Sequence, residues 1–148
     1  MKLALHLATR VLGPALLIFA LTGCGAPLAD VTATATSAAT YTTDTLMVSC
    51  QADPANAAIY KADATTLLTN CTTAIADAKA MPSTAQLEQD AAAVIQILQE
   101  IIAVIPSVLP IFTAQKAGVT LTPQQDATLA KFYDLKVRLS VIEKRYAK

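Results

Sequence analysis

Residues 83–112 read STAQLEQDAAAVIQILQEIIAVIPSVLPIF, and this stretch decides the fold. Its apolar side chains recur at alternating spacings of three and four residues, which is the period of one face of an α-helix. They are Leu87, Ala91, Val94, Leu98, Ile101, Ile105, Val108 and Phe112. Burying a large aliphatic side chain contributes about 1.5 to 3 kcal/mol before the entropy cost is subtracted. We therefore expect this segment to be the core helix of the domain.

Both ends of this helix carry sequence signals. Ser83 and Gln86 have the spacing of a capping box, which predicts a helix that begins just after Ser83. Pro106 and Pro110 lack an amide hydrogen and predict a kink or a break in the helix. Residues 107–117 are therefore expected to form a bent extension.

A further helical signal follows Gly118, which we expect to close that extension. Thr122, Pro123 and Gln125 supply a helix cap, a proline at the first helical position and a capping box. The residues after them form a stripe at helical spacing, made of Leu129, Phe132, Leu135, Leu139, Ile142 and Tyr146. These patterns predict a final helix from about residue 123 to the end of the chain.

Another helix is predicted upstream of the core helix. Asp53 and Pro54 are typical of a helix start, and Met81 and Pro82 end it, because the residue before proline is pushed out of the α region. Its apolar stripe is mostly alanine and consists of Ala57, Tyr60, Ala64, Leu67, Cys71, Ala74 and Ala78. Such small side chains permit close approach of a neighbouring helix.

Residues 26–45 read APLADVTATATSAATYTTDT and contain almost no large apolar side chain. Threonine loses rotamer freedom in a helix, so this stretch predicts a tether or a weak helix from about residue 30 to 50. We accordingly assign residues 24–45 to a lipid anchor followed by a tether or weak helix, and residues 46–148 to the helical bundle domain.

These elements predict an all-α fold, a small antiparallel bundle of about four helices. The composition agrees, because alanine is frequent, aromatic residues are few, and Gly118 is the only glycine after Gly25.

A competing interpretation concerns residues 91–112, which are long enough to cross a bilayer as a helix. Glu100 and the two prolines oppose it, and Gln96, Glu100 and Ser107 share one side, as in a helix half buried in protein.

The first 25 residues indicate where the chain resides. Lys2 and Arg10 precede an apolar run at residues 11–20, which is typical of a secretory signal. The tetrapeptide at residues 21–24, LTGC, resembles the lipobox of bacterial lipoproteins at every position. The resemblance implies a signal peptide at residues 1–23, lipidation of Cys24 and fatty acylation of the new amino terminus. With Gly25 next, it also implies an outer-membrane anchor facing the periplasm in a Gram-negative cell.

Removal of residues 1–23 leaves 125 residues (148 minus 23), which suits one domain. The mature chain then holds nine Lys and Arg (11 minus Lys2 and Arg10) against 11 acids, a net charge of −2. This charge argues against a nucleic-acid partner.

Six bases gather near the carboxyl end, namely Lys131, Lys136, Arg138, Lys144, Arg145 and Lys148. They define a possible surface for anionic lipid or an acidic partner, although such helices are usually solvated. Asp134 and Arg138 are also spaced for an i,i+4 ion pair.

Cys50 and Cys71 remain after lipidation, and an exported pair predicts a disulfide. The prediction conflicts with a straight helix from residue 54, which carries Cys71 about 25 Å beyond its start at 1.5 Å per residue. Bridged Cα atoms lie about 4.4 to 6.8 Å apart. Three solutions remain open: a break in the helix between about residues 58 and 63, an intermolecular bridge, or two free thiols.

Catalytic residues are scarce. The single histidine is His6, which lies in the predicted signal peptide, so the mature chain lacks histidine-based triads and histidine ligands for zinc. Glu100, in the most apolar stretch, is the only candidate general acid, for a cell-wall glycan, and a surface role explains it better. We expect no enzymatic activity, no cofactor and no metal.

Taken together, these features predict a non-catalytic envelope lipoprotein whose helical domain acts as a structural or accessory module. It is expected to bind the membrane through Cys24 and a protein partner through a helical face, with self-association left open. The alternative is a protective or lytic lipoprotein of a mobile element, acting in phage exclusion, toxin inhibition or lysis.

Overall fold

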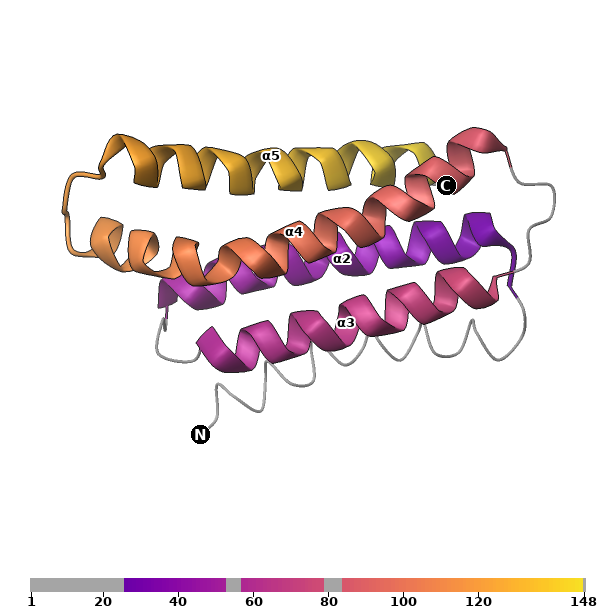
Figure 1. The fold of residues 1–148 in the computed structure, drawn as a ribbon, viewed down its shortest axis with the longest axis horizontal. Helices are drawn as coiled ribbons and strands as arrows, with labels where there is room; N and C mark the ends of the chain where they lie inside the picture. Colours follow the sequence, from indigo (N-terminus) through magenta and orange to yellow (C-terminus); the bar gives the residue numbers. More distant parts are fainter. Residues whose placement is uncertain (1–25, 53–56, 79–83, 148) are drawn as a thin grey trace.

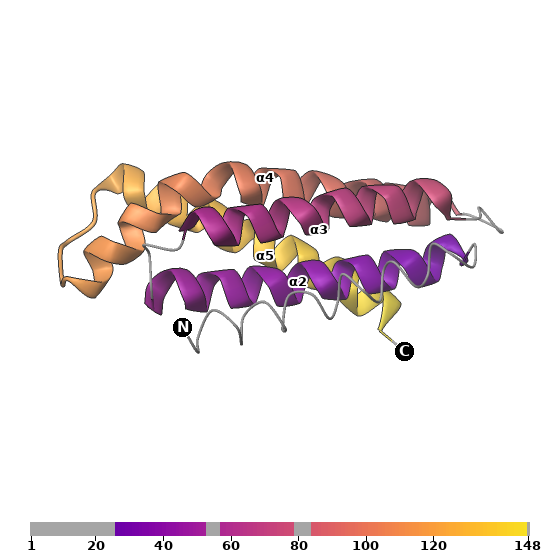
Figure 2. The ribbon, with the colours of Figure 1, turned by 90° about the horizontal axis from the view of Figure 1, so that it is seen from below.

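The computed structural model describes residues 26–52, 57–78 and 84–147 of the 148-residue chain. They form four helices: α2 (Leu28–Ala52), α3 (Ala57–Asp77), α4 (Ala85–Lys116) and α5 (Pro123–Tyr146). Each helix runs antiparallel to the one before it in the chain, and the four lie side by side as an elongated bundle (Figures 1 and 2). The predicted all-α bundle is confirmed.

The segment at residues 85–116 is the core helix, as predicted. α4 packs against α2, α3 and α5, and its buried side includes every member of the predicted stripe from Leu87 to Phe112. Its start lies one residue later than expected, because the hydroxyl of Thr84, not Ser83, caps the helix by accepting from the Leu87 amide at 3.2 Å. Ser83 itself lies outside the described residues.

Pro106 and Pro110 do not break α4, which continues to Lys116. Both prolines are exposed, so the carbonyl groups that lose an amide partner lie on the solvent side of the helix. The helix ends at Lys116, and Gly118 follows the C-cap residue Ala117 with a φ of 72°, the left-handed conformation that glycine adopts without strain.

Helix α5 follows the prediction closely. Thr122 accepts from the Gln125 amide at 3.3 Å, and the Gln125 side chain accepts from the Thr122 amide at 2.9 Å, which completes the capping box. Five members of the predicted stripe are buried and the sixth, Tyr146, is half-buried.

The predicted boundary of the bundle at residue 46 is wrong, because α2 begins at Leu28 and is an integral part of the core. Val31, Ala35 and Ala39 are buried, and so are the threonines Thr32, Thr36, Thr42 and Thr43. Short side chains let α2 lie close to the three other helices at once. Some threonine hydroxyls donate to the carbonyl four residues earlier, as from Thr36 to Thr32 at 2.6 Å, which satisfies them within the helix.

The predicted disulfide between Cys50 and Cys71 is also wrong. Cys71 is a free thiol, buried within the bundle. Residue 50 lies in the last turn of α2, whereas Cys71 is 14 residues into α3, about 21 Å along the helix axis. The unbroken α3 therefore separates the two positions, and burial also removes Cys71 from an intermolecular bridge. The predicted helix start at residues 53–54 lies outside the described residues.

By length and composition, α4 is the one described helix that could cross a membrane. In the bundle, its apolar side faces the other helices, and Gln96 and Gln99 are exposed on the other side. This arrangement is that of the predicted half-buried core helix.

Candidate functional site

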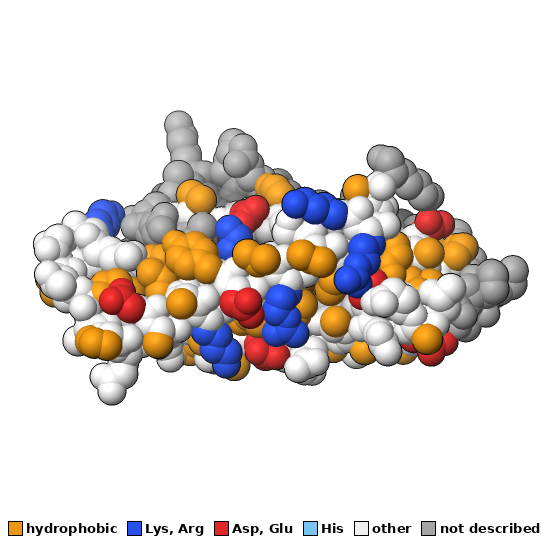
Figure 3. All heavy atoms as spheres, turned by 90° about the horizontal axis from the view of Figure 1, so that it is seen from above, with side chains coloured by type: hydrophobic (Ala, Val, Ile, Leu, Met, Phe, Trp, Pro, Cys, Tyr) orange, Lys and Arg blue, Asp and Glu red, His pale blue; other side chains and the backbone are white. Residues whose placement is uncertain are grey.

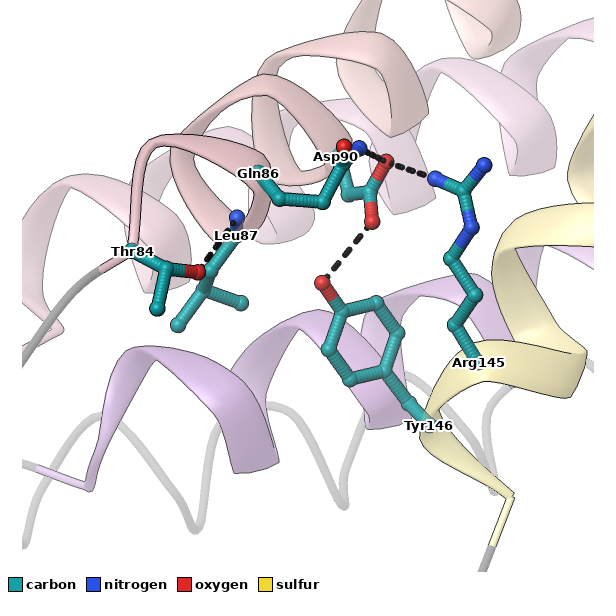
Figure 4. A network of polar contacts seen from close by, with 6 residues as sticks. All are labelled: Thr84, Gln86, Leu87, Asp90, Arg145 and Tyr146. Atoms are coloured by element: carbon teal, nitrogen blue, oxygen red, sulfur yellow. Dashed lines mark hydrogen bonds and ion pairs between the residues drawn. The ribbon is translucent and has the colours of Figure 1, made fainter.

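A polar cluster centred on Asp90 joins α4 to the last turn of α5. Arg145 donates to Asp90 Oδ1 at 2.6 Å, Tyr146 donates to Oδ2 at 2.9 Å, and Gln86 donates to Oδ1 at 2.9 Å (Figure 4). The Asp90 side chain is 5% exposed and that of Arg145 is 47% exposed. The carboxylate is thus nearly enclosed, while the guanidinium reaches it from the surface.

The cluster shifts the acidity of two of its members. Burial by itself raises the pKa of Asp90, but the hydrogen bonds from Tyr146, Arg145 and Gln86, with the charge of Arg145, outweigh it and lower that pKa below its usual value. Burial and the bond to the Asp90 carboxylate raise the pKa of Tyr146 to about 12. Both groups are held in one protonation state at neutral pH, which suits a structural clamp better than proton transfer.

Sequence reasoning missed this role of Asp90, because an acid in the first turns of a helix is explained by the helix dipole alone. One signal was present. Asp90 lies three residues after Leu87 and four before Val94, which places it on the buried side of α4. A charged residue at such a position requires a partner.

Glu100, the one candidate acid for catalysis, has an ordinary surface position. It accepts a hydrogen bond from Gln96, one turn earlier in the same helix, at 3.1 Å. No group of three histidine, cysteine, aspartate or glutamate side chains that could hold a metal occurs among the described residues.

The predicted basic surface divides between two edges of α5. Lys131, Arg138 and Arg145 recur every seven residues along the edge next to α4, where Arg145 contacts Asp90. Lys136 lies on the opposite edge and pairs with Asp44 of α2 at 2.6 Å. Two of the six bases are therefore engaged in ion pairs within the bundle. Lys148 lies outside the described residues.

The predicted ion pair between Asp134 and Arg138 is not formed. Within the described part of the chain, the ion pairs are Lys136 with Asp44 and Arg145 with Asp90. Asp134 and Arg138 are both exposed and point away from the core of the bundle.

Exposed apolar side chains lie on α5 and α2, the two helices that the Lys136–Asp44 pair joins. Tyr133, Val137 and Val141 follow one another at intervals of four residues on α5 and are 42%, 59% and 47% exposed. Tyr41 and Val48 stand three residues before and four after Asp44 on α2 and are likewise exposed. We call these seven residues the α2/α5 face: Tyr41, Asp44, Val48, Tyr133, Lys136, Val137 and Val141.

Figure 3 views the bundle from the side that α5 occupies and shows hydrophobic side chains in a row along it, with basic and acidic side chains on either side. The ring of Tyr133 packs edge-on against Phe132, with centroids 6.2 Å apart. Because Phe132 is buried, this contact holds an exposed aromatic ring in a defined position.

The other predicted site residues give no cluster. Cys24 lies outside the described residues, as does the side chain of Cys50. Cys71 is buried, and burial raises the pKa of its thiol to about 12, which makes it an unreactive core side chain. No protein-family model matches the chain, and comparisons with curated proteins and with solved structures find no match.

Proposed function

We propose that the chain is a non-catalytic lipoprotein of the bacterial envelope that docks a protein partner through the α2/α5 face. One observation carries this proposal. Of the six large hydrophobic side chains exposed in the described part of the chain, five belong to this face and only Val119 lies elsewhere. Exposed apolar side chains concentrated on one side, with charges between them, are typical of an interaction surface.

The position of the predicted anchor supports a site of action next to a membrane. Residues 25–27 are all that separates Cys24 from the first turn of α2 at Leu28. Four residue steps reach at most about 14 Å, so lipidation at Cys24 holds the bundle close to the membrane surface. Leu28 packs in one cluster with Leu87 of α4, and Tyr146 of α5 packs against this cluster, so the anchor would join the bundle at this end.

Lipidation has a direct test. Cells that express the full-length chain are grown with a labelled fatty acid, and the chain is captured through a carboxyl-terminal tag. Label is expected on the parent chain and not on the Cys24→Ser variant. Label on both chains, or on neither, contradicts the anchor.

Docking is tested by cross-linking in living cells, followed by capture from detergent-solubilised membranes and mass spectrometry. Val137→Asp places a charge at the centre of the face and is expected to abolish the dominant cross-linked product. Val119→Asp is the matched control, because Val119 is exposed to the same degree at the loop between α4 and α5. Equal cross-linking by the two variants contradicts docking through this face.

A further inference from the structure

The outward side of α5 carries its charges at opposite ends. Asp126 lies in the first turn and Lys144 in the last turn, and both are exposed. Between them, at helical spacing, are Ala130, Tyr133, Val137 and Val141, which are exposed as well. Neither Asp126 nor Lys144 belongs to the two ion pairs of the described residues. The order along this side is therefore acid, apolar stripe, base.

We infer that this side of α5 binds a second copy of the same chain, with the two α5 helices antiparallel. The inference rests on the proposed docking function and names the occupant of the α5 part of that face. An antiparallel copy places each acid against the base of the other, whereas a parallel copy places acid on acid and base on base. Antiparallel packing also sets the two helix dipoles in opposite directions.

The spacing of the side chains fits the same arrangement. Asp126 lies nine residues before position 135 and Lys144 nine after it, while Tyr133 lies two before and Val137 two after. A two-fold axis next to position 135 therefore pairs Asp126 with Lys144 of the other copy and Tyr133 with Val137 of the other copy. One set of residues satisfies both contacts, which is the property of a self-complementary interface.

Unsatisfied surface charges beside the stripe agree with this register. Asp134 and Arg138, which do not pair within the chain, lie one residue before and three after position 135. In an antiparallel copy, Asp134 lies opposite position 136 of the other helix, which is two residues, or about 3 Å along the axis, from Arg138 of that copy. The dipole of a single helix explains acids at its start and bases at its end, but not why a row of apolar side chains faces solvent between them.

The anchors are compatible with this pairing when the pair lies along the membrane. Antiparallel copies hold the starts of their α2 helices at opposite ends of the pair, and α2 is 25 residues, about 37 Å, long. A two-fold axis perpendicular to both α5 helices keeps the two anchors at the same height along that axis, so both reach one surface. Confinement to a membrane raises the effective concentration, which favours pairing through a modest apolar stripe.

Directional cross-linking tests the arrangement. Full-length Asp126→Cys with one tag is mixed in detergent with full-length Lys144→Cys with another tag, both in a Cys50→Ser background, and then oxidised. A disulfide dimer that carries both tags is expected. Dimers formed only by Asp126→Cys with itself and by Lys144→Cys with itself indicate a parallel pair and overturn the inference, as does the absence of any dimer.

Charge reversal supplies a second readout, the mass of the full-length protein by light scattering. Asp126→Lys alone and Lys144→Glu alone are each expected to weaken the dimer at least about tenfold. The double variant Asp126→Lys/Lys144→Glu is expected to restore it. Weakening without restoration overturns the antiparallel pairing.

The result also separates this inference from the proposed function. If the in-cell cross-links at the α2/α5 face join the chain to a different protein and no self-dimer forms, the docking function stands and the second copy is wrong. If neither product forms, both are wrong.

Discussion

Helices α4 and α2 both line the core, but they fill it with different side chains. α4 contributes Ile, Leu, Val and Phe, whereas the buried side of α2 is mostly alanine and threonine. Large aliphatic side chains gain stability from apolar area removed from water, while small ones gain it from close approach of the backbones. The contrast shows that a helix without a conspicuous apolar stripe can still be a full member of a bundle.

Truncation of a large side chain on α4 is expected to have the largest effect. Ile101 is fully buried, so Ile101→Ala removes apolar contacts, leaves a cavity and lowers the free energy of unfolding by about 3 to 4 kcal/mol. Urea unfolding followed by circular dichroism measures the change. Ile102→Ala, at a half-buried neighbour, is the matched control and should cost clearly less. Equal losses at both positions contradict a core centred on this side of α4.

Enlargement of a small side chain tests the other half of the contrast. Ala39 is fully buried on α2, so Ala39→Leu forces the neighbouring helices apart and lowers the free energy of unfolding by about 2 kcal/mol. Ser37→Leu, on the exposed side of the same helix, should change stability by less than about 0.5 kcal/mol. A neutral Ala39→Leu shows that α2 is not closely packed.

The Asp90 cluster distinguishes α4 further, since α2 has no comparable buried charge among its described residues. Tyr146→Phe removes one hydrogen bond to the buried carboxylate and is expected to cost about 1.5 kcal/mol at neutral pH. Because the folded-state pKa of Tyr146 is raised to about 12, its contribution is complete below about pH 10 and is lost as the pH rises towards 12.

Unfolding measured from pH 8 to 12 therefore shows the parent chain approaching the Tyr146→Phe variant in stability at the alkaline end. Tyr133→Phe, which alters an exposed hydroxyl, is the control and should follow the parent. A constant difference between the parent and Tyr146→Phe across this range contradicts a raised pKa.

The smallest effect is expected on α2 and has the opposite sign. The hydroxyl of Thr42 is buried and has no hydrogen-bond partner in the part of the chain that is described. Thr42→Val keeps the shape, removes the unpaired hydroxyl and is expected to raise the free energy of unfolding by about 1 kcal/mol. Thr36→Val, which loses a hydroxyl bonded to the Thr32 carbonyl, should give no such gain. Equal gains for the two variants refute the distinction between paired and unpaired threonines.

Local signals in the chain predicted much of the fold. Periodicity located the buried stripes of α4 and α5, and the Thr122–Gln125 capping box and Gly118 marked helix ends correctly. The same signals predicted only a tether or a weak helix for residues 26–45 and left them outside the bundle, because propensity and hydrophobicity describe a segment alone. Only the three neighbouring helices explain why alanine and threonine are buried there.

The candidate site was predicted less well, because it depends on distances between helices. The sequence indicated that bases gather near the carboxyl end, but not that Arg145 reaches Asp90 or that Lys136 reaches Asp44. Cysteine counting suggested a disulfide, whereas the rise along α3 keeps Cys71 away from the end of α2. The exposed apolar residues of α5 were absent from the prediction, since the buried stripe of that helix accounted for its periodicity.

The sequence by itself determined that this chain forms helices, where most of them end, and that α4 lies at the centre. These properties follow from the spacing of residues within one segment, where backbone hydrogen bonding and side-chain periodicity act locally. The tertiary structure alone decided that α2 belongs to the core, that Asp90 is a buried acceptor, and that Tyr133, Val137 and Val141 remain at the surface. Those outcomes depend on which helix covers which face, and this arrangement is determined by contacts between residues far apart in the chain.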